Sequence, residues 1–224
     1  MREPHARLRD RSLDRLAALA DGVFAFALTL IIFEIGVPSS AKIASDAQLW
    51  SALGGLLPHF LMFFLSVLTL GIFWNAQQFQ LDSVDHADRE YTWLSLTYLT
   101  AAATMPFSTA LLGEFITLRL ALAVYWLNLF VFGMTMLLSW RYLRRAGLLH
   151  KDANEVAAST TRRILTAQAL YAIGVLLGLV STYVGIALIV LVQVYFAILV
   201  DSPLLLRLLS TARPHRRRAS QTSN

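Results

Sequence analysis

The stretch RLAALADGVFAFALTLIIFEIGVPSS occupies residues 15–40, and the only charged residue between its arginine and its glutamate is Asp21. The hydrocarbon core of a bilayer is crossed by a helix of about 20 apolar residues. The stretch therefore predicts a transmembrane helix over Leu13–Val37 that ends at Pro38. Arginines precede it, as in a signal peptide, but the run of roughly 22 apolar residues exceeds the roughly 7–15 of a signal sequence. We therefore expect a retained first span.

The rest of the chain has the same character, with 57% hydrophobic and 15% charged residues. Soluble domains carry about 25% charged residues. Long apolar blocks alternate with short charged stretches, which predicts an all-α, polytopic membrane protein. Pro58 is expected to kink the second span. The blocks predict six spans, namely Leu13–Val37, Leu49–Gln78, Arg89–Leu112, Phe115–Leu143, Ile164–Ser181 and Tyr183–Leu206.

The basic residues orient these spans. With six spans, every Lys and Arg except Lys42 and Arg119 falls on one side of the membrane, and the positive-inside rule makes that side cytoplasmic. Both termini are then cytoplasmic, in the plasma membrane of a prokaryote. We expect a basic arm over residues 1–12, a channel-forming unit over 13–211 and a basic tail over 212–224. The arginine clusters are explained by topology, with anionic lipid as a further partner; nucleic acid is not expected.

Neither an enzyme nor a cofactor is expected from the motifs. The chain has no cysteine, and P-loop, HExxH and GxSxG sequences are absent. Among the histidines, only His59 lies within a predicted span.

Two further patterns concern helix packing. The tryptophans near span ends are expected at the membrane interface. The GxxxG pattern from Gly174 to Gly178 permits close approach of two helices. The four tryptophans are Trp50, Trp74, Trp93 and Trp140.

The first span offers a candidate site. Asp21 lies inside the span, where an ionised carboxylate must face protein or water, and Arg15 is its candidate partner. At 100° per residue an arc of about 80° holds a column of side chains, with Thr29 and Glu34 at its margins. Such a column is also typical of packing against lipid or another helix, so its role stays open on this ground. Its members are Gly22, Phe26, Leu30, Phe33 and Val37.

The same residues resemble a known family. Arg15 and Asp21 occupy the charged positions of the RxxxFSD signature of the transmembrane protein 175 family, the endolysosomal and prokaryotic potassium channels, with Leu19 and Ala20 in place of its Phe and Ser. A second block is also similar to the family. It comprises Phe73, Trp74, Asp88, Trp93, Leu94 and residues 105–114 (MPFSTALLGE).

The resemblance implies a homotetramer of six-span subunits whose first helices line a central pore. The narrowest apolar rings would fall on Phe26, Leu30 and Phe33, with Thr29 beside them. Glu34 would lie at the pore mouth. Potassium and other monovalent cations would be the permeant partners, and no cofactor is implied.

In this interpretation Arg15 and Asp21 hold the cytoplasmic halves of the helices together. The constriction would act as gate and weak filter, because apolar rings block ions by expelling water. Two alternatives stay open. One is a secondary transporter or proton pathway that uses Asp21, His59 and Glu34. The other is a non-conducting accessory membrane protein.

Overall fold

The structure is a computed structural model that describes residues 4–40, 43–150 and 153–200. Helices dominate the described residues, and a single isolated bridge joins Val84 to Leu149. The long helices are α1 (Pro4–Ile31), α3 (Leu57–Asp82), α4 (Arg89–Glu114), α5 (Arg119–Ala146) and α6 (Ala153–Gly178). The shorter elements are η1 (Ile32–Glu34), α2 (Asp46–Gly55), α7 (Thr182–Tyr195) and the π-helical turn η3 (Phe196–Val200).

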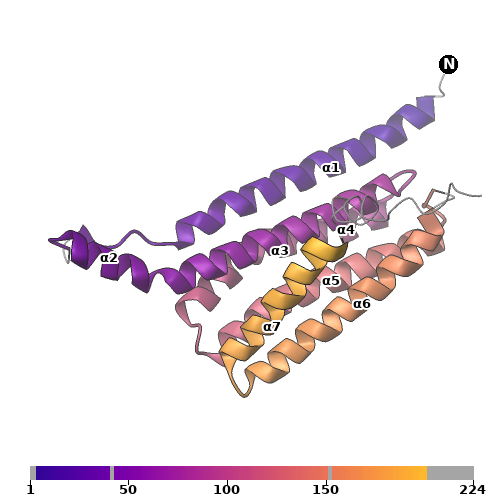
Figure 1. Cartoon of the computed structure of the whole chain (residues 1–224). Coiled ribbons are helices and arrows are strands. Elements are labelled where there is room, and N and C mark those ends of the chain that lie inside the picture. The colour runs from indigo at the N-terminus through magenta and orange to yellow at the C-terminus, as the bar shows by residue number, and fades with distance from the viewer. Residues whose placement is uncertain (1–3, 41–42, 151–152, 201–224) are drawn as a thin grey trace, which may run out of the picture.

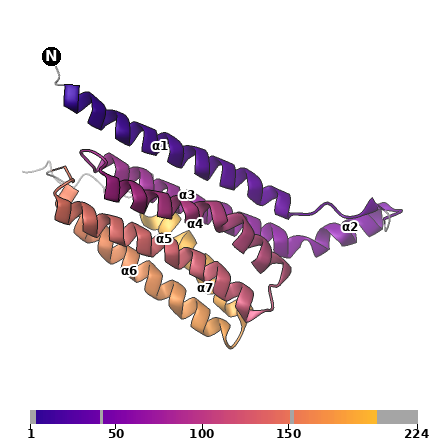
Figure 2. The same cartoon turned by 180° about the vertical axis from the view of Figure 1, so that it is seen from behind.

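The long helices lie side by side in an elongated bundle, with α1 along one edge (Figures 1 and 2). Helix α1 packs on α4 and α3, and then α4 on α5, α5 on α6 and α6 on α7 follow the order of the chain. Helix α7 returns to α3 and closes the bundle. Helix α1 already begins at Pro4, inside the region predicted as an arm. The predicted tail lies outside the described residues.

The second predicted span differs from the structure. Instead of one helix with a kink, α2 ends at Gly55 and α3 begins at Leu57, with Pro58 in its first turn. Proline has no N–H to donate, and the first turn of a helix is where that N–H has no partner within the helix. Pro58 therefore starts a new helix rather than bending a long one.

Within the described part of the chain, three helices are long and apolar enough to cross a membrane, over Ser12–Glu34, Leu57–Asp82 and Arg119–Ala146, and Thr182–Ile198 is a shorter apolar helix. They correspond to the first, second, fourth and last predicted spans. The boundary between the last two predicted spans is confirmed, because α6 ends at Gly178 and α7 begins at Thr182.

The GxxxG pattern is confirmed as a close helix contact. Gly174 and Gly178 on α6 face Gly185 on α7, where an added Cβ would lie 2.6 Å from the Gly174 carbonyl oxygen and 3.0 Å from the Gly178 Cα. Only glycine lets two helix backbones approach so closely. The last two helices therefore form a tight hairpin.

Buried polar side chains join the helices across the core. The Thr69 hydroxyl of α3 lies 3.0 Å from the Tyr125 hydroxyl of α5 and donates to Gln193 Oε1 of α7 at 2.9 Å. Ser66 and Thr109 pair their hydroxyls at 2.5 Å between α3 and α4. In an apolar environment such groups must find partners, so these contacts fix which helices are neighbours.

Trp140 does not fit the predicted interfacial belt. Its side chain is fully buried and lies near the ring of Phe79. Position near a span end could not distinguish this core residue from Trp50, Trp74 and Trp93, which are exposed.

The loops at one end of the bundle are held together. The Asp85 N–H donates to the Leu148 carbonyl at 2.9 Å, and the His150 N–H donates to the Ser83 carbonyl at 3.1 Å. His150 Nδ1 also pairs with Asp85. The end of α3 and the start of α6 therefore lie at the same end of the bundle.

Candidate functional site

Helix α1 has one covered and one uncovered face. The covered face packs small and aromatic side chains against α3 and α4, and the Phe24 ring lies 6.2 Å from Tyr98 and 6.3 Å from Phe132. Its spacing of three or four residues is that of a helix stripe facing a core. This face consists of Leu16, Ala20, Phe24, Ala27 and Ile31, all at most 5% exposed.

The uncovered face carries most of the column predicted from the helical wheel. Phe26 of α1 is 65% exposed, Phe33 of the adjoining turn η1 is 78% exposed, and Val37, which follows η1, is 93% exposed. Thr29 and Glu34 are exposed as well, and Leu30 is half-buried. One protomer thus leaves a row of large apolar side chains without a partner. Such a face on a membrane helix must contact lipid, another subunit or a pore.

The Thr29 hydroxyl donates its proton within α1, while its oxygen can still accept a hydrogen bond. The hydroxyl donates to the Phe26 carbonyl of the preceding turn at 2.8 Å. A hydroxyl has one proton and two lone pairs, so the Thr29 oxygen can still accept from outside the helix. A cation passing this face would meet that oxygen between the two phenylalanines.

Asp21 is held by α3. The Trp74 indole N–H donates to Asp21 Oδ1 at 2.8 Å, and the Gln78 side-chain amide donates to the same oxygen at 2.6 Å. The predicted partner Arg15 makes no ion pair with Asp21 within the described residues; its side chain is exposed. Within one protomer, two neutral donors on α3 therefore contact Asp21, and the role of Arg15 stays a prediction.

Trp74 and Gln78 are functional candidates that the sequence did not single out. Trp74 appears there near a span end and in the block that is similar to the family, and Gln78 appears only as the last residue of a predicted span. Their spacing of four residues puts them on one face of α3. That spacing was the available signal, but it does not say which helix the face meets.

The opposite end of α1 holds a second polar cluster. His59 Nε2 lies 3.5 Å from Glu114 Oε2. Glu34, His59 and Thr109 line the same small cavity, and His59 Nδ1 is buried without a hydrogen-bond partner among the described residues. The structure thus brings His59 and Glu34 together. Asp21 is 13 positions before Glu34, about 20 Å along a helix.

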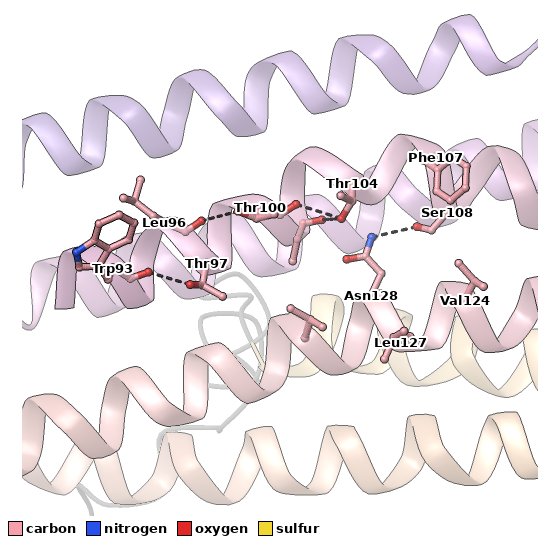
Figure 3. Close-up of a pocket in the computed structure, with 12 residues that line it drawn as sticks. Trp93, Leu96, Thr97, Thr100, Thr104, Phe107, Ser108, Val124, Leu127 and Asn128 are labelled. Carbon is pink, nitrogen blue, oxygen red and sulfur yellow. Dashed lines mark hydrogen bonds between the residues drawn. The ribbon is translucent and has the colours of Figure 1, made fainter. Parts of the chain in front are cut away.

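A groove of about 430 Å³ lies between α4 and α5 (Figure 3). The hydroxyls of Thr97, Thr100 and Thr104 each donate to carbonyls of α4, and Asn128 is hydrogen-bonded to Ser108 at 3.0 Å. The residues that line it carry no ionisable group. The groove therefore offers no charge to attract a cation.

Comparison with known proteins places this arrangement in a family. Residues 15–106 match a family model described as "Endosomal/lysosomal potassium channel TMEM175". A protein of Streptomyces collinus named as a potassium channel is 33% identical over 154 residues, which are 67% of this chain and 73% of that protein. The chain belongs to the TMEM175 family. The matched residues of the TMEM175 model include Asp21, Trp74 and Gln78.

Other TMEM175 relatives extend the similarity. A protein of Chamaesiphon minutus named as a potassium channel is 28% identical over 190 residues, which are 82% of this chain and 93% of that protein. A crystal structure described as a lysosomal potassium-selective channel TMEM175 homologue from that organism has a TM-score of 0.73 and 26% identity, and covers 83% of this chain and 96% of its own. A Bos taurus protein named as an endosomal/lysosomal proton channel TMEM175 is 40% identical over 70 residues, 29% of this chain and 15% of that protein.

The resemblance predicted from the first-helix signature is therefore confirmed. TMEM175 relatives are named as channels, a class that is not enzymatic and for which no cofactor is expected. The chain is an all-α membrane protein of this family.

Proposed function

We propose that this protein is a potassium-permeable cation channel, a homotetramer of six-span subunits whose α1 helices surround a central pore. The names of its relatives support permeation of potassium. One observation carries the proposal for this chain. The face of α1 that the protomer leaves bare is the face that the family resemblance assigns to the pore.

In this assembly Phe26, Leu30 and Phe33 form the constriction. Four copies of each narrow the pore with apolar surface, and water leaves such a space before it closes sterically. Potassium loses its hydration shell more readily than sodium, so slight widening would favour it modestly. The Thr29 oxygens are the coordinating groups nearest to this constriction. Glu34 stands beyond Phe33, at the pore mouth, where a carboxylate raises the local concentration of cations.

Asp21 sets the position of the cytoplasmic half of α1 in this proposal. Its hydrogen bonds to Trp74 and Gln78 hold α1 against α3. Arg15, exposed in one protomer, remains available for a contact with a neighbouring subunit.

The test is potassium flux into proteoliposomes that contain the purified protein. We expect flux above protein-free vesicles, and a several-fold increase in Phe26→Ala or Phe33→Ala. Phe107→Ala is the matched control, because Phe107 is 66% exposed but lies on α4. Flux that stays at the protein-free level in the wild type and in both α1 variants, all of them tetrameric, would exclude the channel.

The proton pathway is the second candidate, and one observation favours it: His59, Glu34 and Glu114 gather at one end of α1. Proton uptake into the same proteoliposomes is measured with an entrapped pH indicator. Proton uptake that His59→Gln abolishes, with no potassium flux, would favour this function. The same residue change should leave potassium flux in place if α1 lines a cation pore.

We place the channel in the plasma membrane with both termini cytoplasmic, and the channel-forming unit over residues 13–211. The basic last turn of α5, with Arg144 and Arg145, supports this orientation. Because the chain has no cysteine, single substitutions test it directly. Ala87→Cys in the α3–α4 loop should resist a membrane-impermeant maleimide in whole cells, whereas Ser39→Cys should react. The reverse pattern would invert the topology.

A further inference from the structure

A cavity of about 660 Å³ lies between α3, α5 and α6, with Phe196 of η3 also in its wall. It is separate from the uncovered face of α1. Its volume falls within the roughly 300–1,000 Å³ of small-molecule sites in proteins. Its place behind α3 gives it no role in the proposed pore.

The cavity has a polar end and an apolar end. Helix α3 runs toward the joined loops and α6 runs away from them, because the bridge between Val84 and Leu149 links the two ends. Asp82 and Arg163 therefore lie toward the loops, whereas Ile72 and Tyr171 lie deeper in the bundle.

The deeper part is lined by large apolar side chains, with the amides of Asn75 and Gln168 among them. Phe73 and Met136 face it together with Ile164 and Phe196. A hydrocarbon chain fits such a lining, because apolar surface is removed from water on both sides of the contact.

The end toward the loops carries one charge of each sign. Arg163 and Asp82 are both exposed, and neither makes an ion pair with a described residue. A guanidinium is well suited to a phosphate, and a carboxylate accepts hydrogen bonds from an amine. A ligand whose head carries a phosphate and a primary amine satisfies both groups.

We propose that this cavity binds an aminophospholipid of the cytoplasmic leaflet, with its phosphate at Arg163, its amine at Asp82 and an acyl chain among the deeper apolar residues. The charged groups of the lipid then lie at the charged end of the cavity, and its acyl chain contacts the apolar side chains of the lining. Binding itself does not depend on the proposed channel function.

The site is connected to the uncovered helix. Gln78 lines the cavity and donates to Asp21 of α1 at 2.6 Å. Phe73, also in the wall, stacks on Phe132 with ring centroids 4.3 Å apart and planes at 7°, and Phe132 lies beside Phe24 of α1. A bound lipid would therefore contact Gln78, one of the two α3 side chains that position α1, together with Phe73. This step rests on the proposed function.

Photolabelling tests the cavity. The full chain is placed in phosphatidylcholine vesicles with a trace of phosphatidylethanolamine that carries a diazirine in its acyl chain, and labelled peptides are mapped by mass spectrometry. We expect label on α3 and α6, reduced at least fivefold by Ala167→Phe, which fills the cavity. Ala169→Phe, exposed and outside the lining, should label like the wild type. Equal labelling of the two variants would overturn the site, as would label confined to other helices.

The headgroup is tested with side chains that leave the cavity open. Arg163→Gln should lower labelling by phosphatidylethanolamine several-fold, and Arg162→Gln, whose arginine does not line the cavity, should not. Asp82→Asn should move the preference from phosphatidylethanolamine to a phosphatidylglycerol probe. Equal labelling by both probes in the wild type would overturn the amine contact, and an unchanged Arg163→Gln would overturn the phosphate contact.

Flux separates this inference from the channel. Specific labelling in vesicles without potassium flux would support the lipid site and count against the proposed function. Potassium flux with no labelling of the cavity would support the channel and overturn the lipid site.

Discussion

The Trp74 indole N–H donates to Asp21 Oδ1 across 2.8 Å, and this contact joins two helices at positions 53 residues apart in the chain. With the Gln78 amide on the same oxygen, it gives α1 a polar attachment to α3 within an otherwise apolar contact. The attachment lies on the cytoplasmic side of the Phe26 constriction in the proposed orientation. It is the point at which the position of α1 can be altered without changing the side chains that we propose to face the pore.

Removing the indole donor should loosen α1. Trp74→Phe keeps an aromatic ring but deletes the indole N–H. Because Asp21 is exposed, we expect the free energy of unfolding to fall by about 1 kcal/mol or less. Potassium flux should change several-fold although no residue of the uncovered face is altered. Asp21→Ala removes both hydrogen bonds and should impair assembly or opening more strongly. An unchanged tetramer with unchanged flux in Asp21→Ala would remove this role. The control is Trp93→Phe, which also replaces an indole, because Trp93 is exposed on α4. Its potassium flux should stay at the wild-type level.

The Thr29 oxygen should assist permeation. Thr29→Val replaces the hydroxyl with a methyl group of similar size, and a loss of about 1 kcal/mol of cation stabilisation slows passage about fivefold. Thr29→Ser keeps the oxygen and should stay near the wild-type rate. Potassium and sodium uptake into proteoliposomes measure both. Equal rates in the valine and serine variants would show that cations do not use this oxygen.

The α6–α7 hairpin should not tolerate a side chain at Gly185. A Cβ there would meet the Gly174 carbonyl oxygen at 2.6 Å and Leu122 Cδ2 at 2.9 Å. Overpacking of this kind costs about 1–3 kcal/mol, so Gly185→Ala should lower the thermal midpoint in detergent. Gly71→Ala is the control, because a Cβ at Gly71 has nothing within 4 Å. If both variants have the same thermal midpoint, the close contact does not contribute to stability.

The buried hydroxyl of Thr69 should contribute to stability. Thr69→Val leaves Gln193 Oε1 without the donor that lies 2.9 Å away, and we expect a cost of about 1 kcal/mol. Thr104→Val should be nearly neutral, since that exposed hydroxyl bonds only carbonyls of its own helix. Unfolding in denaturing detergent compares the two. A Thr69→Val protein as stable as Thr104→Val would contradict the role of the buried network.

The sequence predicted those features that depend on one helix at a time. Apolar length located the first span, and helical periodicity selected the side of it that is uncovered. Glycine spacing predicted the close contact at Gly174. Each of these follows from the geometry of a single helix, which the order of residues determines.

What depended on a second helix could not be predicted in the same way. The donors to Asp21 lie on α3, and the sequence around Asp21 does not identify them. Trp140 has the same place near a span end as Trp93, yet one is buried and the other exposed, because only Trp140 is covered by neighbouring helices. Pro58 was consistent with both a kink and a helix start.

The two faces of α1 have a consequence for how this protein can evolve. Side chains such as Phe26 and Phe33 are mostly exposed and contribute little to the packing of their own protomer, so mutation can exchange them without unfolding it. Phe24 and Ile31, only a few positions away, have no such freedom. In the proposed channel, substitutions on one side of this segment would change conductance, while the other side preserves the fold.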